Sequence, residues 1–245
     1  MSAVSAEVLK LRSTRTFLWV VVSLAAIVFL AAVVHFLGFY TSLLDDAAEQ
    51  RAILTEIGVM MGLVFAAIAG SLSITTEVRH GTIRPTLLKQ PDRWRLLRAK
   101  LVTQLPIGAG LAVFATALAL ALAAPLLHTR GLSPALDAAA DTRLVIGAAV
   151  GGAGFAVLGV AIGALVRNQV PVVVGLLVWM LFIENLLRAA VPSLGRFAPG
   201  SLGRAIAADG TGHLGSPLLA SSLLVALTAV TLGAARLAFE RRDIV

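Results

Sequence analysis

The sequence contains no cysteine, and only 13% of its 245 residues are charged. The absence of cysteine excludes disulfides, thiolate catalysis, iron–sulfur ligation and cysteine-bound zinc. The scarcity of charge excludes intrinsic disorder, because disordered chains are highly charged and weakly hydrophobic. It also excludes a water-soluble globule, in which about 25% of the residues are charged and about 45–50% are apolar. Here 58% are hydrophobic and the mean hydropathy is +0.93, so we expect an integral membrane protein.

Six apolar stretches are long enough to cross roughly 30 Å of hydrocarbon, which takes about 20 helical residues. The alternating pattern of a transmembrane strand is absent, so we expect helices, whose backbone groups bond internally. The predicted fold class is an all-α integral membrane protein with a single transmembrane domain, residues 1–245. The predicted spans are residues 17–39, 57–75, 101–127, 144–166, 170–187 and 218–239.

Basic residues gather on the cytoplasmic side of a membrane protein, so the net charge of +7 is interpreted as topology and not as a nucleic-acid surface. One side carries the N-terminus, residues 77–100, Arg167 and the C-terminal tail, with most of the 20 Lys and Arg residues. The other side holds only Arg51, Arg130, Arg143, Arg188, Arg196 and Arg204. We expect both termini in the cytoplasm. The many arginines, alanines and glycines favour a GC-rich bacterial genome, hence the bacterial inner (plasma) membrane.

Two segments outside the spans have their own patterns. Residues 2–15 place Val4, Val8 and Leu11 on one helical face beside basic residues, which predicts an N-terminal amphipathic helix at the membrane interface. Residues 188–217 are mildly apolar and contain prolines and glycines. They predict a re-entrant outer segment of two short helices, which requires protein or water to satisfy the broken backbone.

The loop at residues 77–100 contains the most informative pattern. Gly81 and Pro85 divide it, and from Asp92 a second helix would place Trp94 and Leu97 on one face with basic residues beside them. We expect this helix to lie on the inner membrane face before it turns into the third span. The alternative is a solvated basic loop that only fixes the topology.

The segment Ser73-Ile74-Thr75-Thr76-Glu77-Val78-Arg79-His80-Gly81-Thr82 ends the second span, and residues 83–88, 91–93 and 239–243 continue the same pattern. In these features the chain resembles the membrane subunits of type-2 ABC exporters, which are six-span permeases paired with a separate ATPase. The resemblance covers nearly the whole chain. It departs at Val78, where an aromatic residue is common in the family.

The resemblance implies a transport subunit that forms the cargo pathway and is not itself an enzyme. It also implies two ATPase chains and a second, identical permease chain as partners, with ATP and magnesium bound to the ATPase. The loop after the second span would form a cytoplasmic coupling helix that docks on the ATPase. Carried onto this chain, the coupling residues are Gly81, Thr82, Ile83, Arg84, Leu87 and Leu88, with Glu77 and Arg79 at the hinge.

The residues themselves agree that this chain binds no ATP by the usual route. A phosphate-binding loop requires the pattern G-x-x-x-x-G-K-[ST]. None of the three lysines, Lys10, Lys89 and Lys100, follows a glycine. We therefore expect no cofactor on this chain and an ATPase on another polypeptide.

Glu184 is the only acidic residue inside the predicted spans, and an ionisable residue in the membrane is a functional candidate by default. It lies near the outer end of the fifth span, four residues before Arg188. One interpretation is a structural i,i+4 ion pair with Arg188 or a carboxylate that reaches the interface. The other is a residue that lines the cargo pathway together with Asn185.

Two other classes of function remain as alternatives. A proton-coupled secondary carrier would use Glu184 and His35, but it needs a longer relay of ionisable groups. An intramembrane enzyme needs clustered His, Asp or Glu, whereas the four histidines lie in different regions. In the fourth span, Gly147, Gly151, Gly159 and Gly163 have the spacing of close helix packing. The low charge favours an amphipathic drug, peptide or lipid as cargo.

Overall fold

The computed structural model describes residues 15–39, 47–82, 93–129, 131–132, 137–207 and 216–241. Within these residues every regular element is a helix, and six helices are long and apolar enough to cross a membrane. The prediction of an all-helical, multi-pass membrane protein is confirmed. The expected amphipathic helix at residues 2–15 lies outside the described residues.

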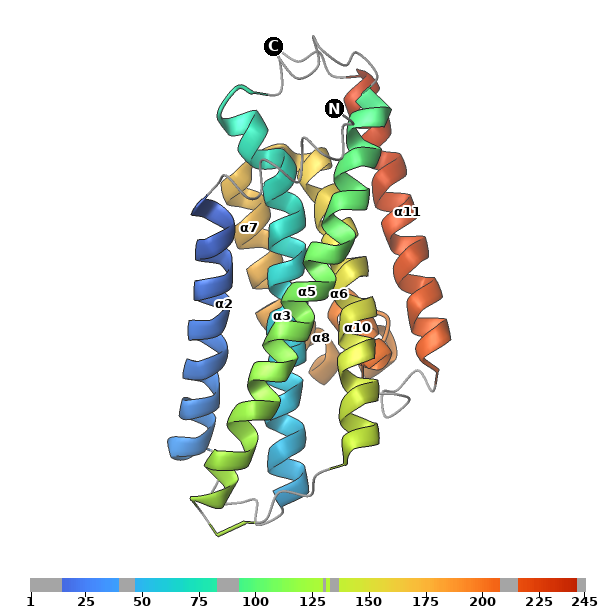
Figure 1. Ribbon diagram of the computed structural model, residues 1–245. Helices are drawn as coiled ribbons and strands as arrows, with labels where there is room; N and C mark the ends of the chain where they lie inside the picture. Colours follow the sequence, from blue (N-terminus) through green and yellow to red (C-terminus); the bar gives the residue numbers. More distant parts are fainter. Residues whose placement is uncertain are drawn as a thin grey trace.

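The six long helices are arranged as a bundle (Figure 1). They are α2 (Arg15–Val34, continued by the π-helix η1, His35–Phe39), α3 (Ala47–Arg79), α5 (Arg93–His128), α6 (Ala138–Val166), α7 (Gln169–Val178, continued by the π-helix η2, Trp179–Ile183, and α8, Glu184–Ala190) and α11 (Pro217–Arg241). Two short helices, α9 (Pro192–Gly195) and α10 (Pro199–Ala207), follow α8.

The helices extend well beyond the predicted spans. α3 has 33 residues, about 50 Å of helix, so polar turns project beyond a hydrocarbon core of about 30 Å. Glu49 and Glu56, which precede the predicted span 57–75, belong to α3. Pro106, the sixth residue of the predicted span 101–127, lies in the interior of α5 because this helix begins at Arg93. Hydropathy marks only the part of a helix that lies in hydrocarbon.

The start of α5 corrects a second expectation. The residues after Asp92 do not form a separate helix on the membrane face, since α5 is continuous from Arg93 to His128. Leu97 is buried in a cluster with Ile74 of α3 and Ala235 of α11, and Trp94 packs at its edge. The apolar face with Trp94 and Leu97, which we expected at the membrane interface, therefore packs against protein.

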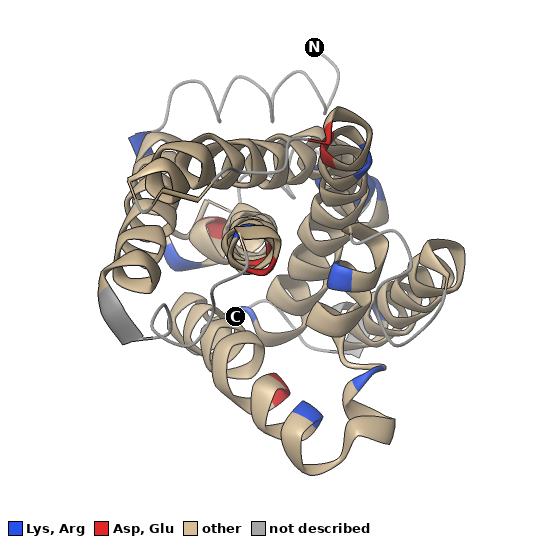
Figure 2. Ribbon diagram, turned by 90° about the horizontal axis from the view of Figure 1, so that it is seen from below, with Lys and Arg blue, Asp and Glu red and all other residues tan. Residues whose placement is uncertain are grey.

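The centre of the bundle is α3. Of its most apolar 18 residues 72% are buried, against 17% for α2, and Figure 2 shows one helix end-on inside a ring of others, with few charged residues on the ribbon. α3 packs closely against α5 and α6 through small residues. A Cβ added at Gly159 would lie 2.0 Å from the carbonyl oxygen of Ala67, and one at Gly163 would lie 2.8 Å from that of Ser71. The glycines of the fourth span therefore serve packing, as predicted.

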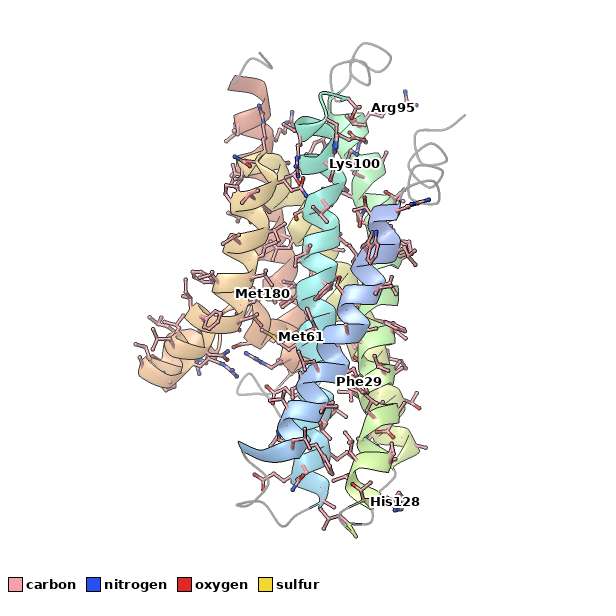
Figure 3. The ribbon with its side chains drawn as sticks, turned by 90° about the vertical axis from the view of Figure 1, so that its left-hand side faces the viewer. Phe29, Met61, Arg95, Lys100, His128 and Met180 are labelled. Atoms are coloured by element: carbon pink, nitrogen blue, oxygen red, sulfur yellow. The ribbon has the colours of Figure 1, made fainter. Side chains whose placement is uncertain are left out.

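The bundle has two ends, which we name after residues that lie there. Arg95 and Lys100 lie at one end and His128 at the other (Figure 3). We call them the Arg79 end and the His128 end, since α3 finishes with Arg79 near the start of α5. The start of α2 and the end of α11 also lie toward the Arg79 end (Figure 1). An even number of spans brings the first and the last helix ends to the same side. That this side is the cytoplasm stays a prediction from the distribution of charge.

Candidate functional site

At the Arg79 end an ion pair joins α3 to α5. Lys100 Nζ lies 2.9 Å from Glu77 Oε1, and the exposed fractions of the two side chains are 2% and 11%. Lys100 also donates a hydrogen bond of 2.8 Å to the carbonyl oxygen of Ser73. A buried charge needs such compensation, because an unpaired one is costly to remove from water. The pair holds the last turn of α3 against α5.

Directly after this pair α3 ends in a glycine turn. Gly81 has a φ of +68° and an amide that donates to the carbonyl oxygen of Val78, which is a common helix termination. No atom lies within 4 Å of a Cβ added at Gly81, and Thr82 is exposed. The predicted break at Gly81 is confirmed. The remaining coupling residues predicted from the sequence, Ile83, Arg84, Leu87 and Leu88, lie outside the described residues.

Basic side chains link the other helices at this end. Arg79 donates to Gln169 Oε1 at 3.3 Å, which joins α3 to α7. Arg167, in a left-handed turn between α6 and α7, donates to the carbonyl oxygen of Ala238 at 3.1 Å. Arg236 of α11 stacks over Trp94 of α5. Arginines that the sequence pattern assigned to topology thus also connect helices.

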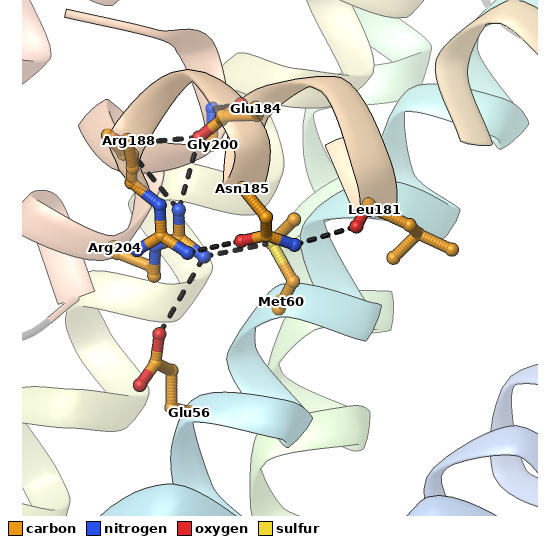
Figure 4. Close-up of polar contacts among 9 residues, drawn as sticks. Glu56, Met60, Leu181, Glu184, Asn185, Arg188, Gly200 and Arg204 are labelled. Carbon is orange, nitrogen blue, oxygen red and sulfur yellow. Dashed lines mark hydrogen bonds and ion pairs between the residues drawn. The ribbon is translucent and has the colours of Figure 1, made fainter. Parts of the chain in front are cut away.

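Away from the Arg79 end, the side chain of Glu184 is completely buried where α8 meets α10 (Figure 4). Its Oε2 accepts the backbone N–H of Gly200 at 2.9 Å, and its Oε1 accepts from Ser201 Oγ and Arg204 Nη2, each at 3.1 Å. Gly200 and Ser201 form the first turn of α10, whose free N–H groups favour an anion. A Cβ at Gly200 would lie 2.7 Å from Glu184 Oε1, so glycine permits this approach.

The structure does not form the ion pair between Glu184 and Arg188 that was one interpretation of their spacing. Arg188 donates to Asn185 Oδ1 on its own helix, and the Glu184 carboxylate, with no exposed surface, does not reach the interface. The partner of Glu184 is Arg204, 20 residues further on. Helical spacing identifies only neighbours on one helix, and here α10 folds back against the buried face of α8.

Arg204 divides its guanidinium between two carboxylates. Its Nη2 contacts the buried Glu184, while its Nη1 lies 3.6 Å from Oε1 of Glu56, whose side chain is 54% exposed. Burial lowers the pKa of Arg204 and the neighbouring charge of Arg188 lowers it further, whereas Glu184 and Glu56 raise it. Arg204 thereby connects α3, α8 and α10.

A further ion pair lies near the start of α3. Arg51 Nη2 lies 2.6 Å from both carboxylate oxygens of Asp141, at the start of α6. This pair joins the start of α3 to α6, and the Glu77–Lys100 pair joins the end of α3 to α5. No sequence signal indicated either pairing, because the partners are 90 and 23 residues apart and belong to no motif.

In comparisons with known proteins, no family model and no curated protein matches the chain. Among the residues described by the structure, no group of three or more His, Cys, Asp or Glu is placed to hold a metal ion. Two of the polar sites described above are candidates for function: the Glu77–Lys100 pair, with the exposed turn after it, and the cluster around Glu184 and Arg204.

Proposed function

We propose that this chain is the permease subunit of a type-2 ABC exporter, which forms the cargo pathway and couples it to ATP hydrolysis by a separate ATPase. The observation that carries the proposal is the end of α3. There the family-like segment 73–82 is held to α5 by Glu77 and Lys100 and finishes in the exposed turn at Gly81 and Thr82. In this proposal two ATPase chains and a second, identical permease chain complete the transporter.

The contacts of α3 support a route by which a movement of the ATPase would reach the other helices. A displacement of residues 81–88 by the ATPase would enter α3 at Gly81. The Glu77–Lys100 pair would pass it to α5, and the close contacts of Gly159 and Gly163 would pass it to α6. Small residues at these contacts bring the helices to backbone distance, so α3, α5 and α6 would move as one unit. On this account residues 81–88 are a lever and do not touch the cargo.

The same proposal gives the bundle its orientation. In a bacterial inner membrane the Arg79 end would face the cytoplasm, with both termini there, because the predicted cytoplasmic segments hold most of the basic residues. α9 and α10 would form the re-entrant outer segment, and Glu184 and Asn185 would lie near the exit of the cargo. The three hydrogen bonds to the Glu184 carboxylate favour an anchoring role over that of a proton carrier.

The test is to ask whether a neighbouring reading frame encodes an ATPase with a phosphate-binding loop, and to co-purify that ATPase with this chain. We expect no ATP hydrolysis by the chain alone and turnover when the two are expressed together. Replacing Leu87 and Leu88 by Asp should release the ATPase, since carboxylates would be desolvated at an apolar contact, while membrane insertion is kept. Thr129→Asp adds a charge at the His128 end and should leave the ATPase bound. Hydrolysis by the pure chain, or retention of the ATPase by the double variant, would refute the proposal.

A further inference from the structure

Arg188 has hydrogen-bonding capacity that the fold does not use. It donates to Asn185 Oδ1, whereas its Nε is buried without a hydrogen-bond partner. In the part of the chain described by the structure, no carboxylate forms an ion pair with it. A guanidinium offers five N–H donors, so most of those on Arg188 remain available to a ligand.

The second guanidinium of this cluster is close by. Arg188 and Arg204 lie beside each other in Figure 4, and the charge of Arg188 acts on Arg204 directly. Two adjacent guanidinium groups repel each other unless an anion lies between or beside them. Glu184 does not supply that anion for both, because among the described residues it forms an ion pair with Arg204 and not with Arg188.

Glu56 is the replaceable carboxylate in this cluster. Its contact with Arg204 is 3.6 Å long and its side chain is 54% exposed, whereas a charge-assisted N–H···O bond normally measures about 2.7–2.9 Å. Exposed ion pairs contribute little stability. An external anion that meets both arginines at shorter distance would therefore displace Glu56 and leave the buried Glu184 contact intact.

The segment that carries Arg188 exposes apolar side chains. Phe182 and Leu186, on η2 and α8, are each 69% exposed, and Leu194 of α9 is 60% exposed. Glu184 is the sixteenth and Arg188 the twentieth of the 22 residues of the candidate span Gln169–Ala190. The cluster therefore lies toward the end of a segment long enough to cross the hydrocarbon core, and the ends of such segments approach the lipid head groups.

We propose that Arg188 and Arg204 form a binding site for the phosphate head of an anionic amphiphile, with Glu56 occupying the site when it is empty. The paired planar guanidinium groups match phosphate oxygens, and the apolar chain of the ligand would lie along the exposed side chains of η2 and α8. Ligand binding would release Glu56 from Arg204 and so loosen the contact between α3 and α10. The proposal does not depend on an ATPase, because binding is a property of this chain alone.

The experiment measures lipid retained by the purified chain in detergent, using native mass spectrometry with phosphatidylglycerol and phosphatidylcholine as probes. Wild type should retain phosphatidylglycerol in preference. Arg188→Gln should reduce that retention about tenfold or more, the equivalent of one charge-assisted hydrogen bond. Glu56→Gln should increase it, because the competing carboxylate is gone. Arg196→Gln is the matched control, because Arg196 stacks on Phe197 and is not part of the proposed site. This variant should retain phosphatidylglycerol as wild type does.

Competition with inorganic phosphate distinguishes a site for free phosphate from a site for a lipid head group. If millimolar phosphate displaces phosphatidylglycerol, the site recognises a free phosphate group; if it does not, the site recognises the head group together with its lipid chains. Equal retention of the two lipids overturns the proposal. Unchanged retention in Arg188→Gln also overturns it, and so does a loss in Glu56→Gln. The opposite signs expected for these two variants distinguish ligand binding from general damage to the fold.

Discussion

The Glu184 carboxylate of α8 and the Arg204 guanidinium of α10 lie 3.1 Å apart, with 0% and 13% of their side chains exposed. Two charged groups are thus removed from solvent to join α10 to the last part of the fifth span. The first turn of α10 completes the site with the N–H of Gly200 and the hydroxyl of Ser201. The Glu184 carboxylate is therefore the polar anchor of α10, beside the apolar packing of Leu202 and Ile206 in the core.

Removing that carboxylate should be costly. Glu184→Gln leaves Arg204 buried without its main counter-charge, and breaking a buried ion pair costs about 3–5 kcal/mol. We expect a large loss of thermal stability in detergent, measured as the fraction of monodisperse chain after heating. Glu56→Gln removes the exposed partner of the same arginine and should cost less than about 1 kcal/mol. Equal losses in the two variants would show that the buried contact is not the dominant one.

The Glu77–Lys100 pair should behave as a coupled unit. Lys100→Met removes the ammonium partner of a partly buried carboxylate, and Glu77→Gln removes the carboxylate partner of a buried ammonium group, so each single variant should lose about 3 kcal/mol or more. The double variant has no charge left to compensate and should lose much less than the sum. Thermal unfolding of the four proteins of this double-mutant cycle measures the coupling. Strict additivity would mean that the two side chains act independently.

Close helix packing should make glycine substitutions strongly position-dependent. Gly159→Ala brings a methyl group to 2.0 Å from a backbone oxygen of α3, whereas a methyl group at Gly233 on α11 meets nothing within 4 Å. The first change should force α3 and α6 apart and destabilise the chain. Gly233→Ala should be neutral or stabilise by about 0.5–1 kcal/mol, because alanine restricts the unfolded chain. A similar effect of both changes on thermal stability would argue against the α3–α6 contact.

Asp137 predicts a pH effect at the start of α6. It caps this helix by accepting the N–H groups of Ala139 and Ala140, and these bonds lower the pKa of its carboxyl. A lowered pKa in the folded state means that the cap stabilises the helix above the unfolded pKa of about 3.9. The stabilisation is lost as the pH falls through the folded pKa. The protection factors of the Ala139 and Ala140 amides, which correct for the slower intrinsic exchange at acid pH, should therefore fall as the pH drops. Asp137→Asn, which keeps an acceptor without the charge, should remove most of that dependence.

The orientation of the bundle can be tested with single cysteines, because the chain has none of its own. Thr82 and Ala48 are both exposed and lie at opposite ends of α3. In intact cells an impermeant thiol reagent should label Ala48→Cys and not Thr82→Cys, as the excess of basic residues in the segments assigned to the cytoplasm requires. Permeabilised cells, in which both positions should react, are the control. The reverse pattern would invert the topology.

The sequence by itself determined that this is a helical membrane protein with six spans. Hydropathy accumulates along a continuous segment, so about 20 apolar residues indicate a span whatever the rest of the chain does. The break at Gly81 and the packing role of Gly159 were equally accessible, because a glycine's lack of a Cβ is a local property. The ends of the helices were not: α3 and α5 continue through polar residues that hydropathy assigns to loops.

Only the tertiary structure decided which charges meet. Glu184 pairs with Arg204 and not with Arg188, Glu77 with Lys100, and Arg51 with Asp141. A helix repeat predicts neighbours three or four residues apart, whereas these partners come from different helices that meet when the bundle packs. The cost of burying a charge makes each pairing necessary, and the arrangement of the helices in space selects the partner.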